Sequence, residues 1–230
     1  MPDCSAPDCS APDSSAPATS APDASAPATP APHPRSPAQR PPVFPHQVTL
    51  TLLAVEDAPV LAELETRNRE QLMAGAPARA EGWFTEAGQR TAIAHAVADR
   101  EAGGGLPFTI RLEDKGATRI VGRLNLSTII RGAFESASLG YWVDTDVTGR
   151  GVATHAVQSA IAVAFGGLGL HRLQAEVKVG NEASVRVLEY CGFTEYGLAK
   201  DYLRLGGDWA DCRLFQLIEP HWQPTAPGSA

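Results

Sequence analysis

The sequence predicts an α/β fold with a mixed sheet, formed by one domain that follows a low-complexity segment. Stretches of alternating apolar residues, typical of strands, are interleaved with stretches of helical spacing, and Gly- or Pro-containing turns separate them. Residues 1–44 contain almost no large apolar side chains, so they cannot bury enough surface to offset the entropy lost on folding. We therefore expect a disordered segment at 1–44, a folded domain at 45–220 and a flexible end at 221–230.

The first segment is a short-period repeat. From Asp3 to Pro32 it consists of pentapeptides, most of which end in Ser-Ala-Pro. Proline in every unit favours extended, polyproline-like conformers and so a stiff, solvated spacer. The start of the chain lacks the basic residues and the apolar run of a secretory signal, and we expect a cytoplasmic protein.

Deleting residues 1–44 is expected to leave the melting temperature and the activity nearly unchanged, because this segment has almost nothing to pack. Thermal unfolding of the full-length and truncated chains, followed by circular dichroism, measures the effect. A large drop in melting temperature on truncation would contradict the expectation.

The folded part begins with a strand and two helices. The alternation at 48–53 predicts the strand, and 56–73 is predicted as a helix because Leu61, Leu64 and Leu72 fall on one helical face before a Gly-Ala-Pro turn. A second helix, at 86–102, stops at three consecutive glycines.

Strands and helices then alternate to the end of the domain. Two strands paired around a turn come first, and Gly166 and Gly167 are expected to cap the helix that follows the strand at 139–143. The predicted strands are 108–112, 120–126, 139–143, 172–179, 196–205 and 213–217, with helices at 151–165 and 182–191. The resulting order is β-α-α-β-β-β-α-β-α-β-β.

Composition narrows the function. The formal net charge is −7, and basic residues are scattered among carboxylates, which argues against a nucleic-acid partner and suits a cationic amine substrate. No apolar run is long enough for a membrane helix. The four cysteines show no metal-binding spacing, so we expect neither a disulfide nor a metal site.

The segment 139–154 combines a strand, a Gly-containing turn and a helix start. Gly149 and Gly151 let the backbone approach a ligand, and the unpaired amides of the first helical turn suit a pyrophosphate. Arg150 could add a cation. By themselves, two glycines before a helix are more often turn-and-cap chemistry than a phosphate site.

A second motif begins at Asn181, a natural N-cap. This cap places Ser184 at the third helical position, where its hydroxyl can face the strand ends and a ligand. Alone, the segment also fits an ordinary capped helix with a solvent-facing serine.

Together these segments resemble the GNAT acyltransferase superfamily, and within it the RimJ/RimL group of ribosomal-protein N-terminal acetyltransferases. The segment 139–143 is similar to the LGYW strand of the family, 148–153 to its Q/R-x-x-G-x-G/A loop, and 181–193 to its N-x-x-S-x-x-x-L-x-x-x-G-F segment. Residues 201–202 and 209–211 resemble its closing hairpin. The resemblance covers nearly the whole folded part and implies the GNAT acyl-CoA N-acyltransferase fold.

The resemblance implies acetyl-CoA as the donor, with its pyrophosphate on the amides of 149–153 and its pantetheine arm along the edge of 141–143. The implied cofactor-binding residues are Tyr141, Trp142, Val143, Thr148, Gly149, Arg150, Gly151, Val152, Ala153, Thr154, Asn181 and Ser184.

Two positions depart from the family pattern. Thr148 stands where Gln or Arg is usual, which predicts weaker but not absent donor binding. Leu188 stands where many relatives carry a tyrosine, and Tyr190 lies two residues further round the helix. Ser184 thus becomes the candidate catalytic proton donor to the departing thiolate.

The remaining chemistry needs an oxyanion donor and a general base. The backbone amide near Val143 is expected to polarise the thioester carbonyl, and the resemblance implies a β-bulge on this strand. Glu135, just before the strand, is the candidate catalytic base, although a solvated loop carboxylate is the simpler interpretation of this residue. The candidate substrate-binding residues are Trp83, Phe84, Arg131 and Tyr202.

Three functions follow from these motifs. The first is an N-acetyltransferase acting on a protein N-terminus or a small-molecule amine. The second is a catalytically idle acyl-CoA-binding or sensing domain, which the altered Thr148 favours. The third, a nucleotide cradle as in a kinase, lacks the Gly-Lys-Ser/Thr ending of a P-loop. An exposed strand edge or helix would also allow two copies to pair as a homodimer.

Overall fold

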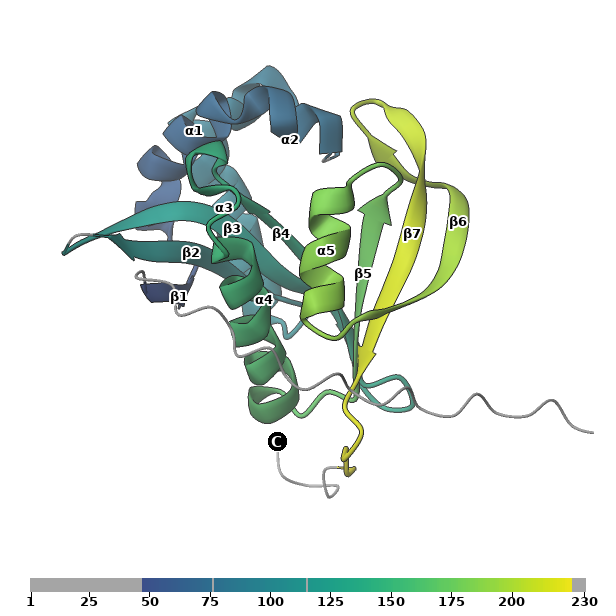
Figure 1. Cartoon of the computed structure of the whole chain (residues 1–230). Coiled ribbons are helices and arrows are strands. Elements are labelled where there is room, and N and C mark those ends of the chain that lie inside the picture. Colours follow the sequence, from purple (N-terminus) through teal and green to yellow (C-terminus); the bar gives the residue numbers. More distant parts are fainter. Residues whose placement is uncertain (1–46, 76, 115, 225–230) are drawn as a thin grey trace, which may run out of the picture. The chain divides into compact units, whose positions relative to one another are not determined.

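The computed structural model describes residues 47–75, 77–114 and 116–224, and these form a mixed sheet with helices on both faces (Figure 1). The segment predicted to be disordered lies outside the described residues. The sheet has the order β1-β2-β3-β4-β5-β7-β6, in which only β4 and β5 are parallel. Its strands are β1 (Gln47–Leu52), β2 (Leu106–Asp114), β3 (Ala117–Ile130), β4 (Ser136–Val143), β5 (Arg172–Lys178), β6 (Thr194–Leu205) and β7 (Asp208–Ile218).

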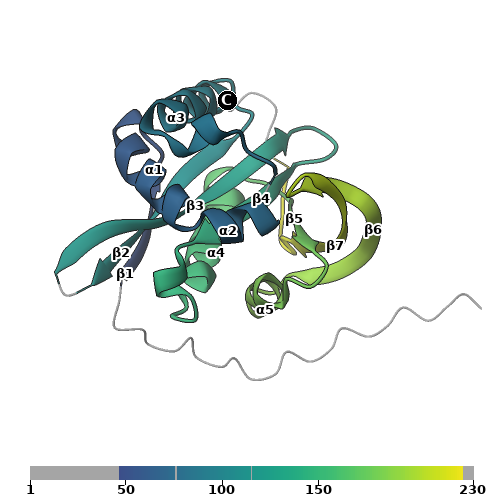
Figure 2. The same cartoon turned by 90° about the horizontal axis from the view of Figure 1, so that it is seen from above.

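The helices are divided between the two faces of the sheet. In Figure 2, α1 and α3 lie on one side of the sheet, while α4 and α5 lie on the other. The helices are α1 (Ala58–Arg67), α2 (Arg69–Gly75), α3 (Glu86–Glu101), α4 (Val152–Ala162) and α5 (Glu182–Tyr190). Short helical turns occur at Val55–Asp57, Glu81–Phe84, Thr145–Val147 and Val163–Gly167. The predicted fold class is confirmed, and the element order agrees except that α1 and α2 stand where one helix was predicted.

The first predicted helix is divided in two. Asn68 separates α1 from α2 with φ −96° and ψ 15°, outside the helical region. Its side-chain amide donates to the carbonyl of Leu64 at 2.8 Å, and its carbonyl oxygen accepts from the amide of Thr145 at 2.9 Å. The interruption therefore makes a contact between the helices and a distant loop, which sequence periodicity cannot reveal.

The helix predicted at 151–165 is also modified at its end. After Ala162 the chain forms a π-helical turn, in which the amide of Leu168 donates to the carbonyl of Val163 at 2.8 Å. Gly166 and Gly167 lie near the end of this turn, and Leu168 is the capping residue.

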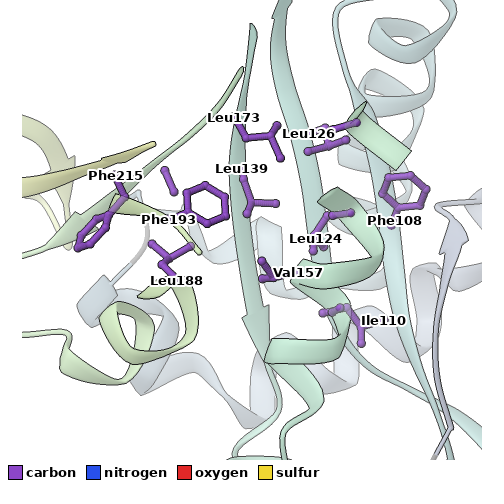
Figure 3. Close-up of a cluster of buried hydrophobic side chains, with 14 of the residues drawn as sticks. Phe108, Ile110, Leu124, Leu126, Leu139, Val157, Leu173, Leu188, Phe193 and Phe215 are labelled. Carbon is purple, nitrogen blue, oxygen red and sulfur yellow. The ribbon is translucent and has the colours of Figure 1, made fainter. Parts of the chain in front are cut away.

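Two clusters of buried side chains hold the layers together. The larger one lies between the sheet and α4 and α5, and Figure 3 shows its side chains, which come from strands and helices as far apart in the chain as Phe108 and Phe215. The smaller one lies under α1 and α3 and includes Leu61 and Leu64, as the helical pattern predicts. Burial of these apolar surfaces is the main favourable term for the fold.

β4 and β5 are paired only at their beginnings. Ser136, Ala137 and Ser138 pair with the first three residues of β5, and the pairing ends there. Beyond this point the two strands diverge, which Figure 1 shows as an opening between β4 and β5. The sheet therefore contains a gap at the carboxyl end of β4, beside the motifs of the predicted site.

Candidate active site

The edge of β4 presents unpaired backbone groups to this gap. The amide of Asp144, just after β4, donates to Val121 of β3 at 2.7 Å, and the carbonyl of Glu135, just before β4, accepts from the first residue of β5 at 3.1 Å. Successive peptide groups of a strand face opposite neighbours, so odd-numbered residues of β4 face β5. The amides of Tyr141 and Val143 thus point toward β5 where the two strands have separated.

The register of β4 is regular at this end. Pairing with β3 runs without interruption from Gly122–Val143 to Ser127–Ser138, and the irregularity lies further along, on β3 before Ile130. The bulge expected on the strand 139–143 is therefore not found in it. The Val143 amide faces the gap because of strand alternation and the loss of the β5 partner.

The start of α4 lies next to the same end of β4. Gly149 and Gly151 have φ of +77° and +76°, in the left-handed region that glycine adopts without strain. A Cβ at Gly149 would meet nothing within 4 Å. The first amides of α4 have no partners within the helix, so this loop can receive an anionic group.

The two side chains in this loop have protein partners. Arg150 forms an ion pair with Asp114 at 3.1 Å, and the Thr148 hydroxyl donates to the carbonyl of Asp144 at 3.4 Å. Neither side-chain contact uses a backbone amide of the loop, although the amide of Arg150 itself donates to the carbonyl of Val147 at 3.3 Å. The loop therefore keeps the features from which a pyrophosphate site was predicted, with Arg150 beside it but paired to a carboxylate.

The predicted N-cap at Asn181 forms, and it fixes Ser184. The Asn181 side-chain oxygen accepts from the Ser184 amide at 3.2 Å, and the Ser184 hydroxyl lies 2.9 Å from the Tyr141 hydroxyl of β4. Burial raises the pKa of Tyr141 to about 12, although the hydrogen bond with Ser184 opposes the shift. The Tyr141 phenol thus stays protonated at neutral pH, and the pair of hydroxyls connects β4 to α5.

A buried carboxylate connects the donor loop to the helices on the other face. Asp144 is fully buried and accepts hydrogen bonds from Arg67, from Asn68 at 3.1 Å and from Arg119 at 3.5 Å. Burial opposes its ionisation, but the hydrogen bonds of Arg67 and Asn68 hold the pKa of Asp144 below its ordinary value. This network fixes the α1–α2 junction against the loop that leads to α4.

Substitution Asp144→Asn is expected to destabilise the protein by about 1–3 kcal/mol at neutral pH, because it weakens a buried, charge-assisted network. The lowered pKa means that the ionised Asp144 stabilises the fold above its unfolded-state pKa of about 4, and that this contribution is lost as the pH falls through the lower folded-state value. Urea unfolding at neutral and at acidic pH measures both effects. Equal loss of stability on acidification in the wild type and the variant would contradict this role.

Two predicted residues lie at the wrong end of β4. Glu135 accepts from the amide of Gly132 at 2.9 Å and pairs with Arg131 at 3.1 Å, and Arg131 also donates to the carbonyl of Leu168 at 2.7 Å. Tyr141 is six residues further along the strand, which amounts to about 20 Å. Glu135 and Arg131 therefore stabilise a turn at the end of β4 that lies away from Tyr141.

Two other predicted acceptor residues belong to the scaffold beside α1. The Trp83 indole donates to Glu65 and stacks under Arg79, whose guanidinium lies 3.8 Å from the ring centre. Phe84 is buried, with Arg69 at 4.5 Å from its ring. These contacts pack Phe84 into the scaffold and hold Trp83 between Glu65 and Arg79.

The face of β5 opposite the main core is polar. Leu173 and Val177 point into the core, so Gln174, Glu176 and Lys178 point to the other face, and Gln174 donates to the Ser138 hydroxyl at 3.0 Å. Burial raises the pKa of Glu176, against the opposing effect of Arg172. The predicted acceptor residue Tyr202 is near enough for the Glu176 charge to raise its pKa, after burial as the larger cause.

The same face of β3 and β4 holds an open position. Trp142 packs against the cluster under α1 and α3, so Gly140, two residues earlier, shares that face and is opposite Asn125 in the register. A Cβ at Gly140 would meet nothing within 4 Å, and the buried side-chain oxygen of Asn125 has no hydrogen-bond partner. We did not predict Asn125, Gly140 or Glu176 as site residues, although strand alternation places each on the face opposite the main core.

A pocket of about 550 Å³ lies between the end of α2, the end of β5 and the hairpin of β6 and β7. On β5 its lining begins at Lys178, two residues after Glu176. It is lined by Met73, Ala74, Lys178, Val179, Leu205, Gly206, Asp208, Trp209, Ala210 and Asp211. It thus extends the polar face toward solvent at the carboxyl end of β5.

The described residues contain neither a metal-binding cluster nor a membrane-spanning helix. Among residues 47–75, 77–114 and 116–224, no group of three or more His, Cys, Asp and Glu side chains is arranged to hold a metal ion. Within those same ranges, no helix is both long and apolar enough to cross a bilayer.

Known proteins are similar to this chain in sequence and in architecture. A model of the acetyltransferase (GNAT) domain matches residues 47–194. A Bacillus subtilis protein named "Probable N-acetyltransferase YjcK" is 33% identical over 168 residues, covering 73% of this chain and 92% of that protein. The [ribosomal protein uS5]-alanine N-acetyltransferase of Escherichia coli is 30% identical over 178 residues, covering 77% and 91%.

A solved structure agrees with these relatives. Mycobacterium smegmatis RimJ, in complex with CoA-disulfide, superimposes with a TM-score of 0.71 at 29% identity and covers 77% of this chain and 85% of that one. The predicted resemblance to the RimJ/RimL group is thereby confirmed. With the divided sheet, the glycine loop before α4 and Ser184 at the start of α5, these matches show that the chain belongs to the GNAT acetyltransferase family and is an N-acetyltransferase.

Proposed function

We propose that the protein uses acetyl-CoA to acetylate the α-amine of a protein N-terminus. The gap between β4 and β5 carries this proposal, because a donor-binding edge and a polar acceptor face meet at it. The Escherichia coli relative acts on an alanine of ribosomal protein uS5, which supports an N-terminal acceptor. A ribosomal protein as acceptor would place the reaction in the cytoplasm.

The donor is proposed to lie on the side of α4 and α5. The amides of Gly149 and of residues 151–153 hold the pyrophosphate. The pantetheine arm runs along the edge of β4 like an added strand and is hydrogen-bonded to the backbone of Tyr141. The Val143 amide then lies in position to donate to the thioester oxygen as negative charge develops on it.

The acceptor is proposed to approach from the opposite face, through the 550 Å³ pocket at the end of β5. Its amine crosses Gly140, where no side chain occupies the space, and the unpaired oxygen of Asn125 is available to accept a hydrogen bond from it. Asp208 and Asp211 line the pocket together with Lys178, and Asp211 is paired with Lys200, so the lining is polar and carries charges of both signs.

Glu176 replaces Glu135 as the proposed general base. It takes a proton from the arriving ammonium, directly or through a water molecule, and its raised pKa suits this task. The neutral amine attacks the thioester carbon and the oxyanion forms. The nitrogen, now positively charged, gives its second proton to water, and the C–S bond breaks as the carbonyl reforms. The sulfur then receives its proton from Ser184. None of these steps requires a metal ion.

A second candidate, an idle acyl-CoA sensor, is supported by one feature. Thr148 is a short side chain bonded to its own loop, where the family usually has a longer polar group. Its presence weakens the donor site on one side while the backbone amides stay available.

Calorimetric titration with acetyl-CoA, followed by a free-thiol assay with amine acceptors, tests both candidates. The acceptors are short peptides beginning with alanine or serine, small amines, and the same peptides with blocked N-termini as controls. Binding with thiol release only from free N-termini is the expected result. Binding without release from any acceptor would favour the sensor, and absence of binding would overturn both candidates.

A further inference from the structure

The contact between Tyr141 and Ser184 is not explained by the fold alone. Tyr141 belongs to a strand and Ser184 to a helix 43 residues away, yet their hydroxyl oxygens lie 2.9 Å apart. The contact spans the region where β4 has lost its β5 partner, so it lies beside the path proposed for the thioester. The interpretation below rests on the proposed function.

We propose that Tyr141 is a positioning residue for acetyl transfer, whose hydroxyl holds the Ser184 hydroxyl so that the serine proton is directed at the departing sulfur. The Ser184 amide is already bonded to Asn181, which fixes the backbone of the first turn of α5. The hydrogen bond to Asn181 leaves the rotation of the serine side chain undetermined. The Tyr141 hydroxyl lies 2.9 Å from the Ser184 hydroxyl and 3.4 Å from the Ser184 carbonyl, so the serine hydroxyl is its nearer partner.

The direction of this hydrogen bond follows from acidity and burial. A phenol is a stronger acid than an aliphatic alcohol, so the better donor of the pair is Tyr141, which stays protonated throughout the neutral range. If Tyr141 donates to the Ser184 oxygen, the serine proton is left to point elsewhere. Because the gap between β4 and β5 lies beside the contact of Tyr141 with Ser184, the serine proton can reach a sulfur atom bound in that gap.

The strand thereby supplies a hydroxyl that the helix lacks. Leu188, at the position where many relatives have a tyrosine, is fully buried in the core. Tyr190 is 43% exposed and cannot serve from the buried side of α5. Tyr141 is the tyrosine whose hydroxyl the structure brings to Ser184.

The proposed step moves one proton from Tyr141 through Ser184 to the departing sulfur. As the tetrahedral intermediate collapses, the C–S bond breaks and its electron pair goes to sulfur. The sulfur takes the Ser184 proton, and Ser184 in turn takes the Tyr141 proton. The tyrosinate recovers its proton from solvent before the next turnover.

Three variants and a control test this role: Tyr141→Phe, Ser184→Ala, the double variant, and Tyr190→Phe. In the free-thiol assay, Tyr141→Phe is expected to lower kcat about tenfold or more, with KM for acetyl-CoA changed by less than about twofold. In the Ser184→Ala background the same change is expected to have almost no further effect, because the tyrosine acts through the serine. Tyr190→Phe should behave like the wild type.

Independent losses of equal size in both backgrounds, or an unchanged kcat in Tyr141→Phe, would overturn the proposal. A loss confined to KM or to the melting temperature would do the same, since it would reveal a packing role. A wild type that releases no thiol with any acceptor would instead reject the proposed function.

A binding measurement tests the role of Tyr141 even if the wild type releases no thiol with any acceptor. The thiol of bound CoA can be titrated by the ultraviolet absorbance of its thiolate, without an acceptor. Donation from an oriented Ser184 should make the pKa of bound CoA lower in the wild type than in Tyr141→Phe, by about one unit. Identical values in the two proteins, or no binding of CoA, would overturn the proposal.

Discussion

Replacing Glu176 with glutamine is expected to lower kcat/KM for the acceptor amine by a factor of about 100 to 1000 near neutral pH. Glutamine keeps the size of the side chain but cannot take a proton. Because burial raises the pKa of Glu176, the wild-type rate should fall on the acidic side at a pH above the ordinary range of a glutamate, as the base becomes protonated. The variant should lose this acidic limb, which a pH profile of kcat/KM measures.

Glu135→Gln is the matched control for this experiment. Glu135 lies just before β4 and is hydrogen-bonded to Arg131 and Gly132, at the end of β4 away from Tyr141. Its variant should therefore retain wild-type activity. Binding of acetyl-CoA should be unchanged in both variants, because neither side chain lies on the donor edge. A loss in Glu135→Gln and none in Glu176→Gln would restore the first assignment and contradict the second.

Replacing Gly140 with valine is expected to reduce kcat/KM for the acceptor about 100-fold or more, while the affinity for acetyl-CoA changes little. The valine side chain would fill the space over β4 that the acceptor amine is proposed to cross. The donor lies along the strand edge, reached from the other face, and should not meet the new side chain. Calorimetry with acetyl-CoA and acceptor kinetics separate the two effects.

Stability provides the control for this change. Gly140 is not among the residues with positive φ, so its backbone accepts a side chain, and valine is well suited to a strand. The melting temperature should therefore stay the same or rise. Gly140→Ala should show a smaller loss of acceptor kinetics than valine, and equal activity across the series would mean that the acceptor does not cross this position.

Local sequence features predicted much of the donor side. The glycines before α4 and the N-cap at Asn181 follow from backbone and capping preferences that act within a few residues, and both features are present in the structure. The order of the elements was likewise predicted from periodicity. The break at Asn68 was not, because its cause is a hydrogen bond to Thr145, far away in the chain.

The acceptor side was predicted less well, for a physical reason. Glu135 was chosen because it adjoins the motif strand, but adjacency does not tell which end of a strand lies at a site. Glu176 and Gly140 were missed because alternation alone does not tell which face of a strand lines the site. That is settled only when the strands pair into a sheet.

The family, the α/β order and the donor motifs can be predicted from the sequence alone, since they depend on residues close together in the chain. The separation of β4 from β5, the set of side chains on the polar face and the contact of Tyr141 with Ser184 become visible only in the folded molecule. Those features depend on strand pairing and packing between distant segments, so no local pattern contains them.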